Sequence, residues 1–275
     1  MLRFHDSSGR VHTSVTLRVA VIGCGCIGAY VGGRLAIANT KDVHVTFLMS
    51  GSASNKRLAA AAQARGSVVL IDPDGIAKLV PCSSIESDKC LFDGAVHFTS
   101  DAAAALASVD VVLVATKRGA NMSIRNTLQE HCPKATVLLF QNGLDAAEEY
   151  GPKSRAYQCI VTMNVVSDPS KAPGVFTRTS HWPKITVDAC VEEACPGIVQ
   201  RLSVAGFTVS AEPTQTFEAV QRGKLIMNMF NAPNALSGLS TVETLLDRRC
   251  LTLAALTARE ALDCFKAAEQ GNYFA

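Results

Sequence analysis

Four polar side chains interrupt the apolar segment GKLIMNMFNAPNALSGL at residues 223–239: Lys224, Asn228, Asn231 and Asn234. At roughly 100° per helical residue, the first three fall within about 60° of one another on one face of a predicted helix. Burying an ammonium and two amides is costly unless they have partners. This polar stripe is therefore either a solvated helix surface or a group of side chains that contacts a ligand.

A lysine beside asparagines is suited to the reduction of a ketone. Hydride arriving at a carbonyl carbon leaves negative charge on the oxygen, which needs a positioned donor and then a proton. A partly desolvated lysine has a lowered pKa and can supply that proton. Asparagine amides hold a hydroxyl or carboxylate without adding charge. On this interpretation the stripe contacts a ligand that carries a carbonyl group.

A glycine-rich turn, GCGCIG at residues 23–28, directly follows an apolar run of strand length and opens a helical pattern. Gly23 permits a tight turn, Gly25 lets a pyrophosphate approach the backbone, and Gly28 lets the helix pack against the strand. The free N–H groups of the helix N-terminus favour the phosphates. The predicted cofactor contacts are Gly23, Cys24, Gly25, Cys26, Ile27 and Gly28. The alternative is a turn that serves packing alone.

The end of the second predicted strand, LMSGSASNKR at residues 48–57, bears on the choice of cofactor. NAD-binding proteins usually place Asp or Glu there to bond the ribose 2′-hydroxyl. Here the segment offers Ser50, Ser52 and Asn55 and then the basic Lys56 and Arg57, which suits a 2′-phosphate and favours NADP(H). The alternative is that Lys56 and Arg57 are ordinary solvated residues at a helix start.

Two further strands end in VATKRG and FQNGLD, which place Lys117, Gln141 and Asn142 at the carboxyl edge of the predicted sheet. Ligands of open α/β sheets bind at that edge. We therefore predict that these three residues contact the cofactor, although Asn142 could equally belong to a plain turn.

Apolar strand-length runs alternate with helical patterns along most of the chain, as in LRVAVIG at 17–23, VHVTFLM at 43–49 and DVVLVAT at 110–116. This order predicts an α/β fold, a Rossmann-type domain with a mainly parallel sheet. Asp74-Gly75 predicts a hairpin between two β-branched runs, and residues 157–188 are expected to form the last strands, some antiparallel. From about Pro196 the pattern is helical to the end. We predict a flexible N-terminal extension (1–16), an NADP-binding domain (17–210) and a helical domain (211–275).

Composition narrows the function classes. The net charge of +2, without a basic cluster that contains aromatic residues, argues against nucleic-acid binding. No apolar run reaches the ~18 residues of a membrane span. The ten cysteines are scattered, which suggests reduced thiols and a cytoplasmic location. The six histidines form no cluster, so no metal site is predicted.

From about residue 17 to its end, the sequence resembles the ketopantoate reductase (2-dehydropantoate 2-reductase) family. The resemblance rests on VAVIGCGCIGAYVGGRLA, DVVLVATKRG, LLFQNGLDAAEE and KLIMNMFNAPNALSGL. It implies an NADPH-binding Rossmann-type domain, a helical C-terminal domain and an active site in the cleft between them. The implied reaction is reduction of 2-dehydropantoate to pantoate, in pantothenate and coenzyme A biosynthesis.

The resemblance also implies residue roles. Lys224 would hydrogen-bond the substrate carbonyl and act as general acid, Asn228 would help hold the substrate, and Asn142 would lie beside cofactor and substrate. Asn231 is included as a substrate contact because it completes the stripe. Ser50 stands where the family often has an arginine.

The family's usual C-terminal segment, which supplies a serine and a glutamate near the substrate, has no counterpart in this sequence. We therefore expect a shortened helical domain with an apolar face around residues 251–265, which a homodimer could cover. Two alternatives follow: a truncated NADP-binding protein without turnover, and a β-hydroxyacid dehydrogenase-like oxidoreductase. The FQNGLD and NAPNAL segments favour the ketopantoate type over the latter.

Overall fold

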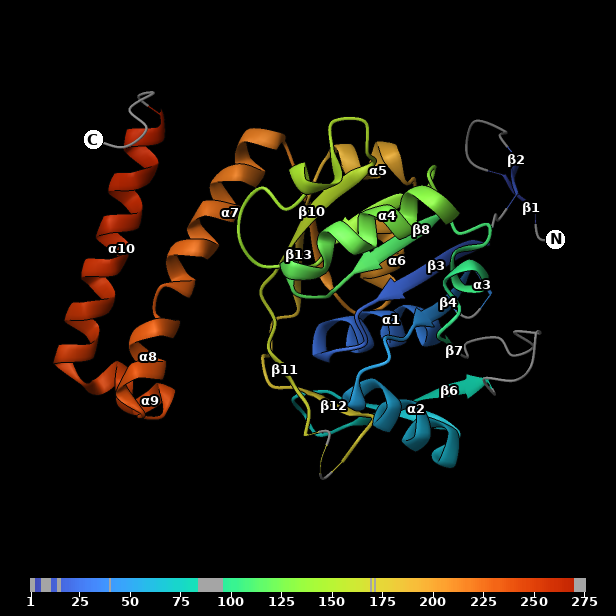
Figure 1. Ribbon diagram of the computed structural model, residues 1–275, viewed down its shortest axis with the longest axis horizontal. Coiled ribbons are helices and arrows are strands. Elements are labelled where there is room, and N and C mark those ends of the chain that lie inside the picture. The colour runs from blue at the N-terminus through green and yellow to red at the C-terminus, as the bar shows by residue number, and fades with distance from the viewer. Residues whose placement is uncertain are drawn as a thin grey trace. The chain divides into compact units, whose positions relative to one another are not determined.

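A computed structural model of the chain describes residues 3–5, 11–13, 16–39, 41–83, 96–168, 170 and 172–269. The chain divides into two compact units (Figure 1). The first comprises Met1–Gln141 and Asp145–Thr214, and the second comprises Asn142–Leu144 and Gln215–Ala275. Within the predicted N-terminal extension, β1 (Arg3–His5) pairs antiparallel with β2 (Val11–Thr13). The rest of that extension, apart from residue 16, lies outside the described residues.

The first unit is built on one sheet, whose strand order is β11-β12-β5-β6-β7-β4-β3-β8-β9-β10-β13-β14. The strands are β3 (Leu17–Ile22), β4 (Val43–Leu48), β5 (Ser67–Ile71), β6 (Ala77–Ser83), β7 (Val96–Thr99), β8 (Val111–Val114), β9 (Thr136–Leu139), β10 (Ala156–Val161), β11 (Val165–Val166), β12 (Val175–Arg178), β13 (Lys184–Asp188) and β14 (Thr208–Glu212). The run from β6 to β10 is parallel throughout. The predicted mainly parallel Rossmann-type sheet is confirmed.

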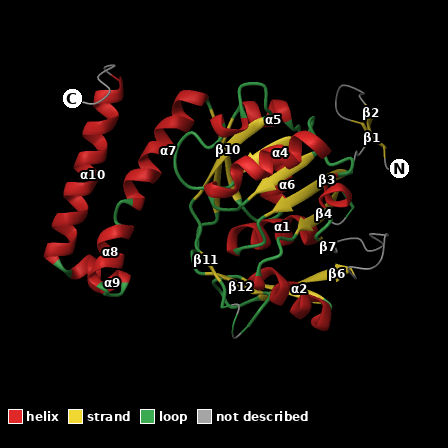
Figure 2. Cartoon of the chain, viewed as in Figure 1, coloured by secondary structure: helices red, strands yellow, loops and turns green. Residues whose placement is uncertain are grey.

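Helices cover both faces of this sheet, as the helix and strand colouring of Figure 2 shows. They are α1 (Cys26–Ala38), α2 (Ala53–Arg65), α3 (Ala102–Leu106), α4 (Asn121–His131), α5 (Cys190–Ala194) and α6 (Ile198–Val204), with the short 3-10 turns η1 (Arg118–Ala120) and η2 (Glu148–Tyr150). Alternate residues of β3 enter opposite cores. Val19 and Val21 pack with α1, whereas Ala20 and Ile22 pack with α3 and α4. Burial on both faces explains why the central strands are continuous apolar runs.

The remaining pairings partly match expectation. β5 and β6 form the hairpin predicted from Asp74-Gly75, and β10–β13 and β11–β12 are antiparallel. The expectation of helix alone after Pro196 is wrong, because β14 pairs in parallel with β13. Its sequence, TVSAE, has no apolar run, since the strand lies at the sheet edge with only one strand beside it.

The second unit is helical, with α7 (Thr214–Asn228), α8 (Asn231–Ser237), α9 (Thr241–Leu246) and α10 (Arg248–Glu269). Thr214, the first residue of α7, still belongs to the first unit. A capping box starts α9, where Ser240 and Glu243 bond each other's backbone N–H groups. The Arg222 guanidinium lies 5.5 Å from the centre of the Phe265 ring, which joins α7 to α10.

The helix α10 has no buried residue, and its leucines at 251, 253, 256 and 262 are exposed. The sequence predicted an apolar face in this region. Among the helices that the structure describes, none is both long enough and apolar enough to cross a membrane.

Candidate functional site

The glycine loop joins β3 to α1 with a geometry that two of its glycines require. Gly23 has a φ of +103°, and a Cβ there would lie 2.7 Å from the backbone carbon of Ala115. A Cβ on Gly28 would lie 2.0 Å from the Gly23 carbonyl oxygen. Both distances are far inside van der Waals contact, so the sequence GCGCIG permits a close turn between β3, β8 and the start of α1.

Gly25 differs from its neighbours, because a Cβ at this exposed residue would meet no atom within 4 Å. It is the N-cap of α1, and that helix starts with neither a side-chain cap nor an acidic residue in its first turn. The N-terminal N–H groups of α1 are thus left for an anion. This open backbone fits the pyrophosphate of a dinucleotide.

Of the other loop residues, Cys24 is buried, and burial raises the pKa of its thiol, so the side chain is neutral. Its Sγ faces the Leu48 carbonyl oxygen at 3.9 Å. Cys26 and Ile27 are half-buried. Any contact that Cys24 makes with a cofactor would come from its backbone.

Small polar groups gather after β4. The Asn55 side chain donates to Ser50 Oγ at 2.8 Å, and Ser52 Oγ, 3.1 Å from Ser50 Oγ, caps the start of α2. Lys56 is exposed in the first turn of that helix. Two cavities, of about 260 and 290 Å³, share part of their lining here, namely Met49, Ser50 and Asn55. The lining of the first cavity also includes Gly23 and Thr116, and that of the second includes Lys56.

A buried amide pair, not apparent from the sequence, links the residues after β9 to the start of α4. Gln141 and Asn121 exchange hydrogen bonds of 2.7 and 3.1 Å, and Gln141 also donates to the Thr116 carbonyl at 3.1 Å. Both residues are under 7% exposed. The Gln141 side chain, predicted to contact a cofactor, is therefore engaged within the protein, whereas Lys117 is exposed.

Glu149 extends this network from η2. Its carboxylate accepts from the Asn121 amide at 2.6 Å and from the Arg118 guanidinium. These hydrogen bonds lower the pKa of Glu149, so it stays ionised. No local pattern in the sequence pointed to Asn121 or Glu149, because their partners are about 20 to 30 residues away.

Within the second unit, Lys224 Nζ donates a 2.9 Å hydrogen bond to Oδ1 of Asn142. The Gln221 amide, one turn earlier on α7, donates to the Gly143 carbonyl at 3.2 Å. Lys224 is half-buried, and desolvation lowers the pKa of its ammonium. Two predicted site residues from distant motifs are thus brought together.

The predicted continuous stripe is interrupted after Asn228, where α7 ends, and Asn231 starts α8. The single helical face assumed from 100° spacing is therefore wrong for Asn231, although Lys224 and Asn228 share α7. Asn231 is exposed and Asn228 half-buried. Asn234 has a structural place instead, since its amide donates to Thr244 Oγ1 at 2.6 Å and to the Leu239 carbonyl at 3.2 Å.

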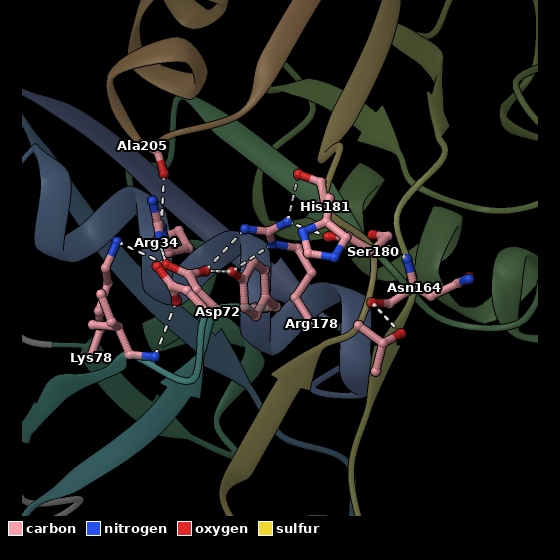
Figure 3. A network of polar contacts seen from close by, with 12 residues as sticks. Arg34, Asp72, Lys78, Asn164, Arg178, Ser180, His181 and Ala205 are labelled. Carbon is pink, nitrogen blue, oxygen red and sulfur yellow. Dashed lines mark hydrogen bonds and ion pairs between the residues drawn. The ribbon is translucent and has the colours of Figure 1, made fainter.

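A second network missed by the sequence surrounds Asp72, in the turn between β5 and β6 (Figure 3). Its carboxylate meets Arg34 at 2.8 Å, Lys78 at 3.0 Å and Arg178 at 3.3 Å, and it accepts from the Tyr30 hydroxyl. These groups come from α1, the hairpin and β12, so the network ties α1 to one end of the sheet.

Among the described residues, no group of three His, Cys, Asp or Glu is placed to hold a metal ion.

Comparison with known proteins decides the family. The sequence profile of ketopantoate reductase PanE/ApbA matches residues 19–189, well over half of the chain. The chain belongs to the ketopantoate reductase family. No curated protein matches the sequence.

Solved structures share the fold of this ketopantoate reductase family member. The PanE/ApbA family ketopantoate reductase from Ralstonia eutropha superposes with a TM-score of 0.71 at 19% identity, over 94% of this chain and 76% of that one. A dimeric ketopantoate reductase from Staphylococcus aureus gives 0.63 at 14%, over 94% and 76%. A D-mandelate dehydrogenase solved with NADH gives 0.63 at 14%, over 92% and 74%.

Proposed function

We propose that this protein reduces 2-dehydropantoate to pantoate with NADPH. The observation that carries the proposal is the hydrogen bond from Lys224 to Asn142. This bond joins the motif that supplies a proton donor to the motif that supplies an amide, and the reduction of a small oxo acid needs both groups. Family membership supports a nicotinamide-dependent oxidoreductase, and the paired residues point to a carbonyl as the reacting group.

In this proposal the Lys224 ammonium donates a hydrogen bond to the substrate carbonyl and then a proton to the alkoxide. Its desolvation lowers the pKa and so makes proton release easier. Asn142 orients the ammonium, and Asn228, one helical turn from Lys224, offers an amide to the carboxylate or hydroxyl of the substrate. Asn231 remains a proposed substrate contact from the start of α8.

NADP(H) is the proposed cofactor, and it would supply the hydride when bound. The open backbone at Gly25 and the first turn of α1 would hold the pyrophosphate. Ser50, Asn55 and Lys56 would hold the 2′-phosphate, since they include no carboxylate that repels it. A D-mandelate dehydrogenase of the same fold was solved with NADH, so the fold alone leaves the choice of cofactor to these side chains.

A homodimer is the proposed assembly. The exposed leucines of α10 offer apolar surface to a second copy, and a ketopantoate reductase of similar fold is dimeric.

The test measures NADPH oxidation with 2-dehydropantoate, through the nicotinamide absorbance, and NADPH binding without substrate. We expect turnover by the parent, a loss of about 10²-fold or more in kcat for Lys224→Ala, and an NADPH Kd within about twofold of the parent value. Lys134→Ala, at an exposed lysine after α4, is the matched control and should leave both kcat and the NADPH Kd unchanged.

NADPH binding without turnover would refute the enzymatic proposal in favour of a cofactor-binding protein. Turnover of a 3-hydroxy acid with NAD would favour a β-hydroxyacid dehydrogenase.

A further inference from the structure

The first unit has another cavity, at the edge of the sheet opposite the glycine loop. It is formed by the C-terminal half of α4, the segment that leads into β9, and residues 151–155 before β10. The parallel strands β9 and β10 start at this edge of the sheet. Gly23 and Gln141 follow the ends of β3 and β9, so they lie at the opposite edge. Its volume is about 400 Å³, within the range of small-molecule pockets. None of the proposed cofactor or substrate residues lines it.

The floor of this cavity is apolar. It consists of side chains that are less than 10% exposed: Leu128, Cys132, Ala135, Val137 and Tyr150. Burial raises the pKa of the Cys132 thiol to about 11, so it is uncharged near neutral pH and adds no negative charge. The floor can therefore accept a hydrocarbon or aromatic group.

Two guanidinium groups in the lining are held in place by the protein. Arg125 Nη1 donates to the Glu149 carbonyl at 3.2 Å, and a Cβ on Gly151 would lie 3.2 Å from Arg125 Nη2. Arg155 Nη2 donates to Thr136 Oγ1 at 3.1 Å and to the Ala194 carbonyl at 2.5 Å. In the part of the chain that the structure describes, their other guanidinium nitrogens make no protein hydrogen bond. These donors are thus left for a ligand or water.

The charged side chains that line the cavity are all positive. Arg125, Lys153 and Arg155 contribute three positive charges, and no Asp or Glu lines the cavity. The nearby Glu149 turns its carboxylate to Arg118 and Asn121, and only its backbone carbonyl meets Arg125. The C-terminal end of the α4 dipole favours cations, but it supplies only partial charge. The balance favours an anion.

We propose that this cavity binds a small amphipathic anion, a carboxylate or phosphate monoester whose apolar body lies on the buried floor. Arg125 and Arg155 present pre-positioned N–H groups to the anionic head, and the Lys153 ammonium adds a point charge from the rim. The site is distinct from the proposed active site and does not depend on catalytic activity.

Isothermal titration calorimetry with phenyl phosphate tests the proposal on the full chain. We expect Lys153→Glu to weaken binding by about tenfold or more, because a repulsive charge replaces an attractive one. Lys41→Glu reverses the same charge at an exposed lysine just before β4, outside the segments that form the cavity, and should change the Kd by less than about twofold. Thermal unfolding of both variants, each at an exposed residue, should match the parent. Saturating NADPH should leave the phenyl phosphate Kd unchanged.

Inorganic phosphate should bind more weakly than phenyl phosphate, because it lacks the apolar body. Equal affinities would contradict the role of the floor. Absence of binding, equal weakening by both lysine variants, or competition with NADPH would each overturn the proposal. A failure of the enzymatic assay would not overturn this proposal, since calorimetry measures binding and requires no turnover.

Discussion

Lys224 on α7 donates a 2.9 Å hydrogen bond to the amide oxygen of Asn142, which lies 82 residues earlier in the chain. A neutral partner orients the ammonium without stabilising its charge as a carboxylate would. Desolvation lowers the pKa of Lys224. This pair combines a fixed donor with a proton that is easier to release.

The pH dependence of turnover should follow Lys224. The residue must be protonated to act as an acid, so kcat should be highest at low pH and fall as pH rises through its lowered pKa. The fall should begin below the ordinary lysine value of about 10.4. In Lys224→Arg the side chain stays charged, so the remaining activity should not show this fall. A profile shared by parent and Lys224→Arg would contradict the assignment.

The glycine loop gives a paired prediction. Gly25→Ala should change the free energy of unfolding by less than about 1 kcal/mol, because its Cβ meets no atom within 4 Å. It should nevertheless raise the NADPH Kd by about tenfold or more, since the methyl group occupies the approach to the backbone. Gly28→Ala should instead destabilise the fold by about 1–3 kcal/mol through overpacking. Chemical denaturation and fluorescence titration measure the two effects. Unchanged NADPH affinity in Gly25→Ala would argue against pyrophosphate at this loop.

The preference for NADPH over NADH should depend on the side chain at position 50. Ser50→Asp places a carboxylate at the end of β4, where it repels a 2′-phosphate and can bond a 2′-hydroxyl. We expect the NADPH Kd to rise about tenfold while the NADH Kd falls. Ser50→Asn, which keeps the site uncharged, is the matched control. If the parent already prefers NADH, the NADP(H) proposal is refuted.

The Asp72 network should contribute to stability in a pH-dependent way. Burial alone would raise the pKa of Asp72, but hydrogen bonds from Tyr30 and Lys78 and the charge of Arg34 hold it well below its ordinary value. A carboxyl whose folded pKa is depressed stabilises the fold above its unfolded pKa, about 3.9, and loses this contribution as pH falls towards the folded value.

Asp72→Asn should therefore destabilise the protein by about 3 kcal/mol at pH 7, and the difference from the parent should shrink below about pH 3.9. Urea denaturation at several pH values measures it. Asp74→Asn, at an exposed position of the same turn, should cost far less. If the two variants lost equal stability, Asp72 and its ion pairs would contribute no more than an exposed carboxylate of the same turn, which would contradict the prediction.

The sequence predicted most of the sheet because its central strands are buried on both faces. The runs that form β3, β8 and β9 are apolar at nearly every position, and the glycine spacing places the first turn. The strand β14 was missed because TVSAE carries no such pattern, and it depends on its tertiary neighbour β13.

Residue type and strand ends singled out Lys224 and Asn142 from the sequence, and the structure joins these two residues by a hydrogen bond. The candidate site was not predictable where a partner far along the chain decides the role. Gln141 ends a strand as expected, yet Asn121 draws its side chain into the interior. Helical spacing could not show that the chain breaks between Asn228 and Asn231.

The second unit takes residues 142–144 from the middle of the chain and the rest from its end. During synthesis, Asn142 therefore leaves the ribosome long before Lys224 exists, and the pair can form only after the whole of the first unit has been made. A fragment that begins after residue 214 would keep the lysine and lose its asparagine. A gene fusion that exchanged the helical unit as one contiguous block would likewise separate Lys224, the proposed proton donor, from the amide to which it is hydrogen-bonded.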